Sequence, residues 1–256
     1  MKFQQIRSAT VKIEFGGKRF LVDPMLSEKG TFPAFPHTPN DHLLNPLVDL
    51  KLPLEEIIDV DCVLITHTHL DHWDDAAKAA IPKDMPIIVQ HAADAVEVKS
   101  AGFINVSILE DTLTLDGITL TKTSGQHGSD QVMEAIGDLL GEVCGIVFTH
   151  PAEKSLYLAG DTVWNDHVAG ALRTYKPDVV ILNAGDAQVI GLGSIIMNKE
   201  DVASVYKATS DATIIASHME TVNHAMLSRT DLRAFLIASE MTDRVLVPDD
   251  AECYSF

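Results

Sequence analysis

The chain has 256 residues, 46% of them hydrophobic, which is enough for a sizeable core and excludes wholesale disorder. Its formal net charge of −18 argues against a nucleic-acid partner, because such proteins need a basic surface, whereas a metal centre can still attract an anionic small molecule. The N-terminus has no signal-peptide core, and no apolar run approaches the roughly 20 residues of a membrane span, so we expect a cytoplasmic protein with no membrane partner.

The first predicted elements are two strands joined by a tight turn. Residues 10–15 alternate apolar and polar side chains, two glycines follow, and residues 18–22 are again typical of a strand. This pattern predicts a β-hairpin. Asp23-Pro24 ends its second strand, as a turn dipeptide does.

A proline-rich segment follows over residues 25–53. It has little periodicity, and it also holds Phe32, Phe35, His37 and His42. A loop of this length in a compact domain is usually functional or mobile. We therefore predict an insert that forms a lid or wall beside an active site, with histidines that either touch substrate or are merely solvated.

The next motif carries most of the chemistry. Residues 60–66 form a largely apolar, β-branched run that predicts a buried strand, and His67-Thr68-His69-Leu70-Asp71-His72 follows it directly. The strand therefore delivers three imidazoles and a carboxylate into one loop. These groups together suit zinc, and also iron or manganese. The sequence thus predicts a metal centre at the end of this strand.

This HxHxDH pattern resembles the metallo-β-lactamase superfamily, and within it the metal-dependent hydrolases similar to ascorbate-phosphate lactonase. The resemblance covers nearly the whole chain. It implies an α/β (α+β) fold, a four-layer αββα sandwich of two mixed β-sheets, formed as one hydrolase domain over residues 1–256. It also implies that Asp23, in an LVDP element, lies behind the metal site and orients a ligand histidine. The alternative for Asp23 is a plain strand-ending turn.

The middle of the chain predicts alternating helices and strands. Helices are expected over 74–80, 92–101 and 131–143, with strands at 86–89, 113–115, 118–121, 145–149 and 155–159. His127 follows the strand at 118–121 and lies between glycines, where the resemblance places a histidine that completes the first metal site. His91 and His150 are the alternatives. Asp161 lies in a Gly-Asp-Thr element like the one whose aspartate bridges two metals in this family.

The last third predicts helices over 164–175 and 199–209, strands over 178–183, 212–217 and 244–247, and a final helix capped by Ser228. His218 directly ends a strand, where the resemblance places the last ligand of the second metal site, and His224 is the alternative. Asp186 follows another strand and should lie at the same rim, beside a glycine-rich segment over 189–194. Asn223 and His224 are then free to face the substrate.

The resemblance implies a hydrolase with two divalent metal ions, zinc first and manganese or iron as alternatives. His67, His69 and His127 hold one metal, Asp71, His72 and His218 hold the other, and Asp161 bridges. A metal-bridged hydroxide then attacks an ester, lactone or phosphoester bond of a small molecule. Asp71 also shuttles a proton, and His224 is the general acid.

Three other functions remain open on the sequence alone. A nuclease or phosphodiesterase of the same fold is disfavoured by the acidic charge balance. A di-iron redox protein of this fold has glutamate where this chain has His69. A non-catalytic metal-binding sensor would keep the same ligands. A homo-oligomer is compatible with all of these, and the substrate is left open because specificity depends on loops.

Overall fold

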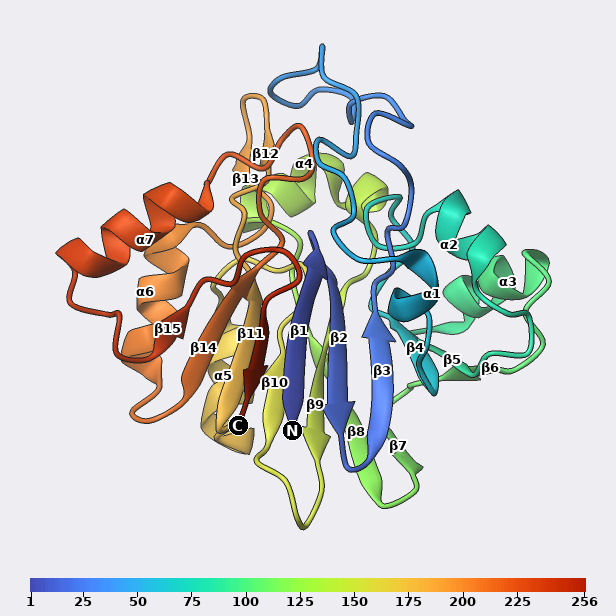
Figure 1. The fold of residues 1–256 in the computed structure, drawn as a ribbon. Helices are drawn as coiled ribbons and strands as arrows, with labels where there is room; N and C mark the ends of the chain where they lie inside the picture. Colours follow the sequence, from blue (N-terminus) through green and yellow to red (C-terminus); the bar gives the residue numbers. More distant parts are fainter.

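The computed structural model describes residues 1–256, and its architecture is a pair of mixed β-sheets packed face to face between layers of helices (Figure 1). The first sheet has the strand order β16-β1-β2-β3-β4-β5-β6. Its strands are β1 (Lys2–Arg7), β2 (Thr10–Phe15), β3 (Lys18–Val22), β4 (Cys62–Ile65), β5 (Ile87–Val89), β6 (Val106–Ile108) and β16 (Cys253–Ser255).

The second sheet has the order β15-β14-β11-β10-β9-β8-β7, and a short ribbon of two further strands stands apart from both sheets. The strands of the second sheet are β7 (Thr112–Leu115), β8 (Ile118–Ser124), β9 (Cys144–Thr149), β10 (Leu156–Leu158), β11 (Val179–Asn183), β14 (Thr213–Ser217) and β15 (Val245–Leu246). The ribbon pairs β12 (Gln188–Val189) with β13 (Gly193–Ser194).

Helices cover the outer face of each sheet, which completes the four-layer αββα arrangement. Figure 1 shows the first three helices on one side of the molecule and the last three on the other. No helix is both long enough and apolar enough to cross a membrane. The helices are α1 (Leu54–Ile57), α2 (Asp75–Ala80), α3 (Ala92–Ser100), α4 (Asp130–Leu140), α5 (Asp166–Tyr175), α6 (Lys199–Ala208) and α7 (Arg229–Ala238).

The core strands are buried on both faces, as their near-continuous apolar sequences predict. In β4, Leu64 belongs to the core between the sheets, whereas Val63 packs outward against the layer of α2 and α3. Between the sheets, the ring of Phe148 meets the rings of Phe15 and Phe20 edge-on, with centroids 5.6 Å apart in each case. This inter-sheet core fixes one sheet against the other.

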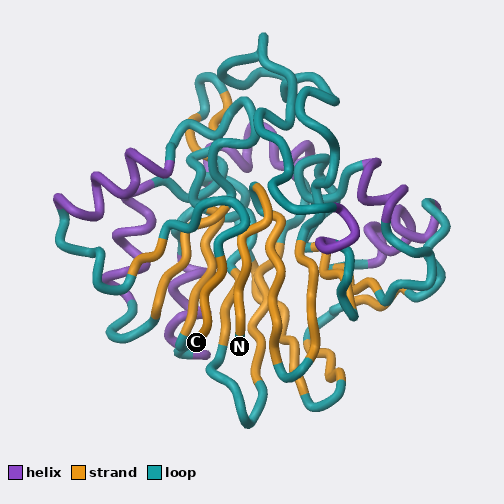
Figure 2. Tube along the Cα trace, in the orientation of Figure 1, coloured by secondary structure: helices purple, strands orange, loops and turns teal.

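Parallel pairing brings several strand ends to one rim. The pairs β3–β4, β4–β5, β10–β11 and β11–β14 are all parallel, so their carboxyl ends lie on the same side of the molecule. Loops follow those ends and gather there with the irregular segment that precedes α1 (Figure 2). Polar residues that follow these strands are therefore brought together although they are far apart in sequence.

Most predicted elements are confirmed, but the edge of the first sheet was not predicted. β1 lies between β2 and β16, so the two ends of the chain pair with each other, with Lys2 opposite Ser255. Periodicity could not reveal these strands, because their partner lies at the other end of the sequence. Helix α4 also ends earlier than predicted, at Leu140, because Gly141 has a φ of 67° and interrupts the helical backbone.

One glycine is required by the close approach of two backbone segments at this rim. A Cβ atom on Gly185 would lie 2.0 Å from the carbonyl oxygen of His218. Gly185→Ala should therefore lower the free energy of unfolding by about 1–3 kcal/mol and displace His218. Gly170→Ala is the matched control, because in α5 its nearest neighbour would be Arg173 at 3.9 Å, and it should stabilise by about 0.5–1 kcal/mol. Urea denaturation measures both changes, and equal effects would contradict the packing argument.

Candidate metal centre

The loop that follows β4 is fixed from behind by Asp23. Its Oδ1 accepts a hydrogen bond from the backbone N–H of Thr66, and its Oδ2 accepts one from the Thr66 hydroxyl, each at 2.7 Å. The same Oδ2 lies 2.9 Å from Nδ1 of His72. Asp23 therefore holds both the start of the HxHxDH loop and one of its histidines, which is the place that the sequence predicts for it.

Four imidazoles converge on a single oxygen, Oδ2 of Asp161, which follows β10. The Nε2 atoms of His72, His127, His218 and His67 lie 3.1, 3.6, 3.7 and 3.9 Å from it, respectively. The other oxygen, Oδ1, accepts a 2.7 Å hydrogen bond from Nδ2 of Asn183 at the end of β11. Asn183 thus leaves Oδ2 as the oxygen that faces the histidines.

Around this oxygen the side chains form two groups. Nε2 of His67 and Nδ1 of His69 lie 3.0 Å apart, and His127 completes the first group. In the second group, Nε2 of His218 lies 3.2 Å from Nε2 of His72 and 3.4 Å from Oδ2 of Asp71. The structure thus brings together all seven side chains that the sequence predicts as metal ligands, while their ligand role stays a prediction.

The proton positions of these imidazoles fit a bound cation. Nδ1 of His127 lies 2.8 Å from the carbonyl oxygen of Ile195, which can only accept, so Nδ1 carries the proton and Nε2 presents its lone pair to the centre. Nδ1 of His72 lies 2.9 Å from Oδ2 of the Asp23 carboxylate, as an ion pair rather than an aligned hydrogen bond. Nδ1 of His218 forms a 3.2 Å hydrogen bond with the Ser8 hydroxyl. Outward nitrogens have protein partners and inward nitrogens crowd together, which is the arrangement a metal requires.

Electrostatics inside the cluster keep the ligands in the protonation states that metals bind. Burial lowers the pKa of His67 and His127 and lowers the pKa of His69 to about 4. Burial would raise the pKa of Asp161, but the charges of His72 and His218 hold it well below its usual value. His72 is the exception. Burial by itself would lower its pKa, but the carboxylates of Asp161, Asp23 and Asp71 raise it by more, so that the net pKa lies well above the ordinary value. Without a cation, His72 is the group that balances the buried carboxylates.

The remaining predicted residues lie around the cluster in different settings. The ring of His224 meets that of Phe35 edge-on at 4.9 Å between centroids, its buried Nδ1 has no hydrogen-bond partner, and burial lowers its pKa to about 4. Its neutral ring disfavours the predicted role of an imidazolium acid. The side chain of Asn223 is bound to the segment before α1 through all of its polar atoms, and its predicted contact with substrate stays a prediction. Asp186 accepts hydrogen bonds from Gln188 and Ser194 in the β12–β13 ribbon, outside the cluster.

The two alternative histidines are used elsewhere. Nδ1 of His91 accepts a hydrogen bond from the backbone N–H of Asp94 and so caps α3. His150 follows β9 in the turn toward β10, where it accepts from the backbone N–H of Ala152. That turn lies at the end of the sheet opposite the rim, so His150 cannot reach Asp161.

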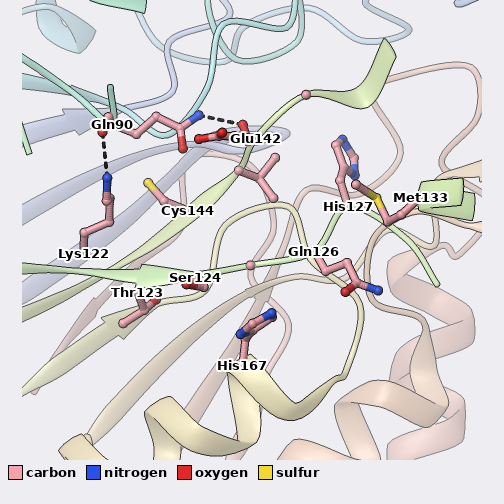
Figure 3. A pocket seen from close by; sticks show the side chains of 13 residues that line it. Gln90, Lys122, Thr123, Ser124, Gln126, His127, Met133, Glu142, Cys144 and His167 are labelled. Atoms are coloured by element: carbon pink, nitrogen blue, oxygen red, sulfur yellow. Dashed lines mark hydrogen bonds between the residues drawn. The ribbon is translucent and has the colours of Figure 1, made fainter. Parts of the chain in front are cut away.

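A cavity of about 400 Å³ lies beside the centre rather than over it (Figure 3). Of the seven convergent residues only His127 lines it, and Met133 of α4 lies next to that ring. Its far wall is closed by hydrogen bonds from Lys122 to the carbonyl of Gln90 and from the Gln90 side chain to the carbonyl of Glu142.

Three supporting residues were missed by the sequence analysis. Asn183 ends a strand next to that of Asp161, so its position as a polar strand-end residue was a usable signal. Ser8 and Ile195 gave none, because each reaches its histidine only through tertiary packing. Ser8 lies in the turn between β1 and β2 of the first sheet, whereas His218 follows a strand of the second.

Comparison with known proteins agrees with this geometry. Residues 18–219 match the family model described as the beta-lactamase superfamily domain. The UPF0173 protein YddR of Bacillus subtilis (strain 168) is 48% identical over 100% of both chains. A UPF0173 metal-dependent hydrolase of Methanosphaera stadtmanae is 29% identical over 69% of this chain and 72% of its own. The crystal structure of an isothiocyanate hydrolase from Delia radicum gut bacteria is 47% identical, covers 100% of this chain and 99% of its own, and has a TM-score of 0.98.

The contact between Ser8 and His218 predicts a change in metal affinity. Ser8→Ala removes the partner that orients the His218 ring, so affinity for zinc should fall by about 10–100-fold while the fold is kept. Ser204→Ala is the control, because that hydroxyl is exposed and bonds only within α6. Competition against a chelating dye at fixed pH measures both affinities. An unchanged affinity in Ser8→Ala would show that the ring is held by packing alone.

The lowered pKa of His224 predicts a pH dependence of stability in metal-free protein. Because its folded-state pKa is about 4 and its ordinary value is 6.5, the unfolded chain takes up the proton first as the pH falls. The stability that the neutral His224 contributes is therefore fully present above pH 6.5 and is lost as the pH falls toward 4. Between about pH 7 and 4.5, wild type should lose about 2–3 kcal/mol more than His224→Gln. Urea titrations with chelator present measure this difference, and parallel curves would refute it.

Proposed function

This chain belongs to the metallo-β-lactamase superfamily, and we propose that it is a metal-dependent hydrolase that uses two divalent metal ions. The observation that carries the proposal is the convergence of four Nε2 atoms on Oδ2 of Asp161, with no more than 3.9 Å between that oxygen and any of them. Inward-facing imidazole nitrogens packed so closely around a carboxylate form an arrangement that a bound metal ion would stabilise. A related chain of the family carries the name metal-dependent hydrolase.

The residues that would hold the two ions follow from the two groups of side chains. His67, His69 and His127 would hold one ion, the second group would hold the other, and Asp161 would bridge them. Imidazole and carboxylate ligands without thiolate suit zinc first, with manganese or iron as alternatives. When bound, such ions supply Lewis acidity and lower the pKa of coordinated water, which makes hydroxide available near neutral pH.

The chain's own residues supply proton transfer and substrate binding. Burial would raise the pKa of Asp71, but His72 and His218 lower it, so its carboxylate stays ionised and can take up the proton that water gives up. Burial lowers the pKa of His224 to about 4, so its ring is neutral near pH 7, and its Nδ1 is buried without a partner. Nε2 is then the ring nitrogen that would donate a hydrogen bond to the substrate heteroatom, without the ring acting as an imidazolium.

The charges around the centre favour an uncharged substrate. Arg7 donates to backbone carbonyls, and Arg229 pairs with Glu220 and Asp250, so these cations are not free to clamp a phosphate. No hydrogen bond or ion pair joins any lysine or arginine to the seven convergent side chains. A phosphoester would thus find positive partners only in the metal ions, with no lysine or arginine beside them.

We infer that the substrate is an isothiocyanate, as the name of the 47% identical relative states for that protein. Water adds its oxygen to the central carbon, both of its protons pass to nitrogen, and the carbon–nitrogen bond breaks, so that R–N=C=S and H2O give R–NH2 and COS. The nitrogen is the heteroatom that His224 would face. Esters and lactones are the second class, since they are also uncharged electrophiles with a heteroatom leaving group.

Metal content is the first test of this function. Wild type should hold about two zinc, manganese or iron ions per chain, and Asp161→Ala should lose metal and activity with the fold kept. Asp186→Asn is the matched control at the same rim and should keep both, because the Asp186 carboxylate accepts hydrogen bonds only from side chains of the β12–β13 ribbon. Elemental mass spectrometry and circular dichroism measure metal and fold.

Activity is assayed on phenethyl isothiocyanate, 4-nitrophenyl acetate, a butyrolactone and bis(4-nitrophenyl) phosphate, with the phosphodiester expected to be slowest. A protein that takes up no metal would overturn the proposal. A metal-loaded protein that hydrolyses none of these would refute the hydrolase function and favour the metal-binding sensor.

A further inference from the structure

One buried amide holds residues 35–45 of the irregular segment before α1. Oδ1 of Asn223 accepts hydrogen bonds from the backbone N–H of Phe35 at 3.2 Å and from Nδ2 of Asn45 at 2.9 Å. Its Nδ2 donates to the Thr38 hydroxyl and to the carbonyl of Pro39, each at 2.7 Å. An amide side chain has two donor hydrogens and two acceptor lone pairs, so all of its capacity is used within the protein.

The backbone of the same residue continues this connection. The N–H of Asn223 donates to Oδ1 of Asn45 at 2.8 Å, and its carbonyl accepts from Nδ2 of Asn40 at 3.0 Å. Asn45 and Asn223 thus bind each other reciprocally, and they are 0% and 1% exposed. Buried hydrogen bonds of this kind are costly to break singly, because each leaves an unpaired polar group. We call Asn223, Asn45 and Thr38 the amide latch.

The latch determines where Phe35 lies. The backbone N–H of Phe35 bonds to the latch, while its ring meets the ring of His224 edge-on at 4.9 Å and that of Phe32 at 6.1 Å. His224 is the next residue after Asn223, and its own carbonyl accepts from the backbone N–H of Gln188 in the β12–β13 ribbon. Residues 223 and 224 therefore determine the positions of both the Phe35 ring and the His224 ring that it contacts.

We propose that Asn223 is a positioning residue that fixes Phe35 against His224 and thereby determines which substrate side chains are hydrolysed. The inference rests on the proposed function for its substrate, an uncharged electrophile whose apolar side chain packs on Phe35. Phe32 and Phe35 form an apolar wall beside the ring of His224, so such a substrate would pack its side chain on the ring of Phe35.

Kinetics on two isothiocyanates test this role. Asn223→Ala should lower kcat/KM for phenethyl isothiocyanate by about 10–100-fold and change it little for methyl isothiocyanate, because only the larger side chain reaches Phe35. Phe35→Ala should likewise remove the preference for phenethyl over methyl isothiocyanate. In the double variant, kcat/KM for phenethyl isothiocyanate should fall no further than in either single variant. Metal content should stay that of wild type. Asn105→Ala is the control, because its exposed amide bonds only to the carbonyl of Asp84.

Equal losses on both substrates, or an unchanged preference, would overturn the proposal. Should Asn223→Ala not fold, Asn223→Asp serves instead, since it keeps the acceptor for Phe35 but loses the donations to Thr38 and Pro39. Should wild type hydrolyse neither compound, the substrate assignment fails separately, and hydrogen exchange decides the positioning role. The rate of amide hydrogen exchange over residues 32–45 should then rise at least about 10-fold in the Asn223 variant, while the amides of β4 stay protected. Unchanged exchange would refute the latch.

Discussion

Oδ2 of Asp161 is the point on which the rest of the site depends. The four nearest imidazoles come from different places: His67 and His72 from the loop after β4 of the first sheet, and His127 and His218 from strand ends of the second. Their convergence requires the two sheets to keep one relative position. The inter-sheet core around Phe148 supplies that constraint, so the packing of side chains far from the rim determines the geometry of the histidines at the rim.

A second set of residues decides which nitrogen of each imidazole faces the centre. A carboxylate, a carbonyl and a hydroxyl hold the outward Nδ1 atoms of His72, His127 and His218. Because Ser8 belongs to the first sheet and supports a histidine of the second, these contacts also tie the sheets together. The buried carboxylates of Asp161, Asp23 and Asp71 surround His72, and their negative charge raises its pKa.

The Asp161 cluster is built on strand ends, whereas Phe35 lies on irregular chain that a few buried amides hold. Such a division lets side chains of the irregular segment vary without moving the seven convergent residues. It also explains why an irregular segment without helix or strand can present a fixed wall.

The sequence by itself predicted most of the strands and helices and the four candidate ligands of the HxHxDH motif, because apolar periodicity and this motif are local patterns. The layers, the other three candidate ligands and the place of Asp23 behind the centre were implied by the family resemblance. The sequence could not predict the pairing of β1 with β16, the support of His218 by Ser8, or the use of Asn223 as a latch. Each of these joins residues more than 170 positions apart. Hydrogen bonds at such separations leave no periodic signal, so only the tertiary structure determines them.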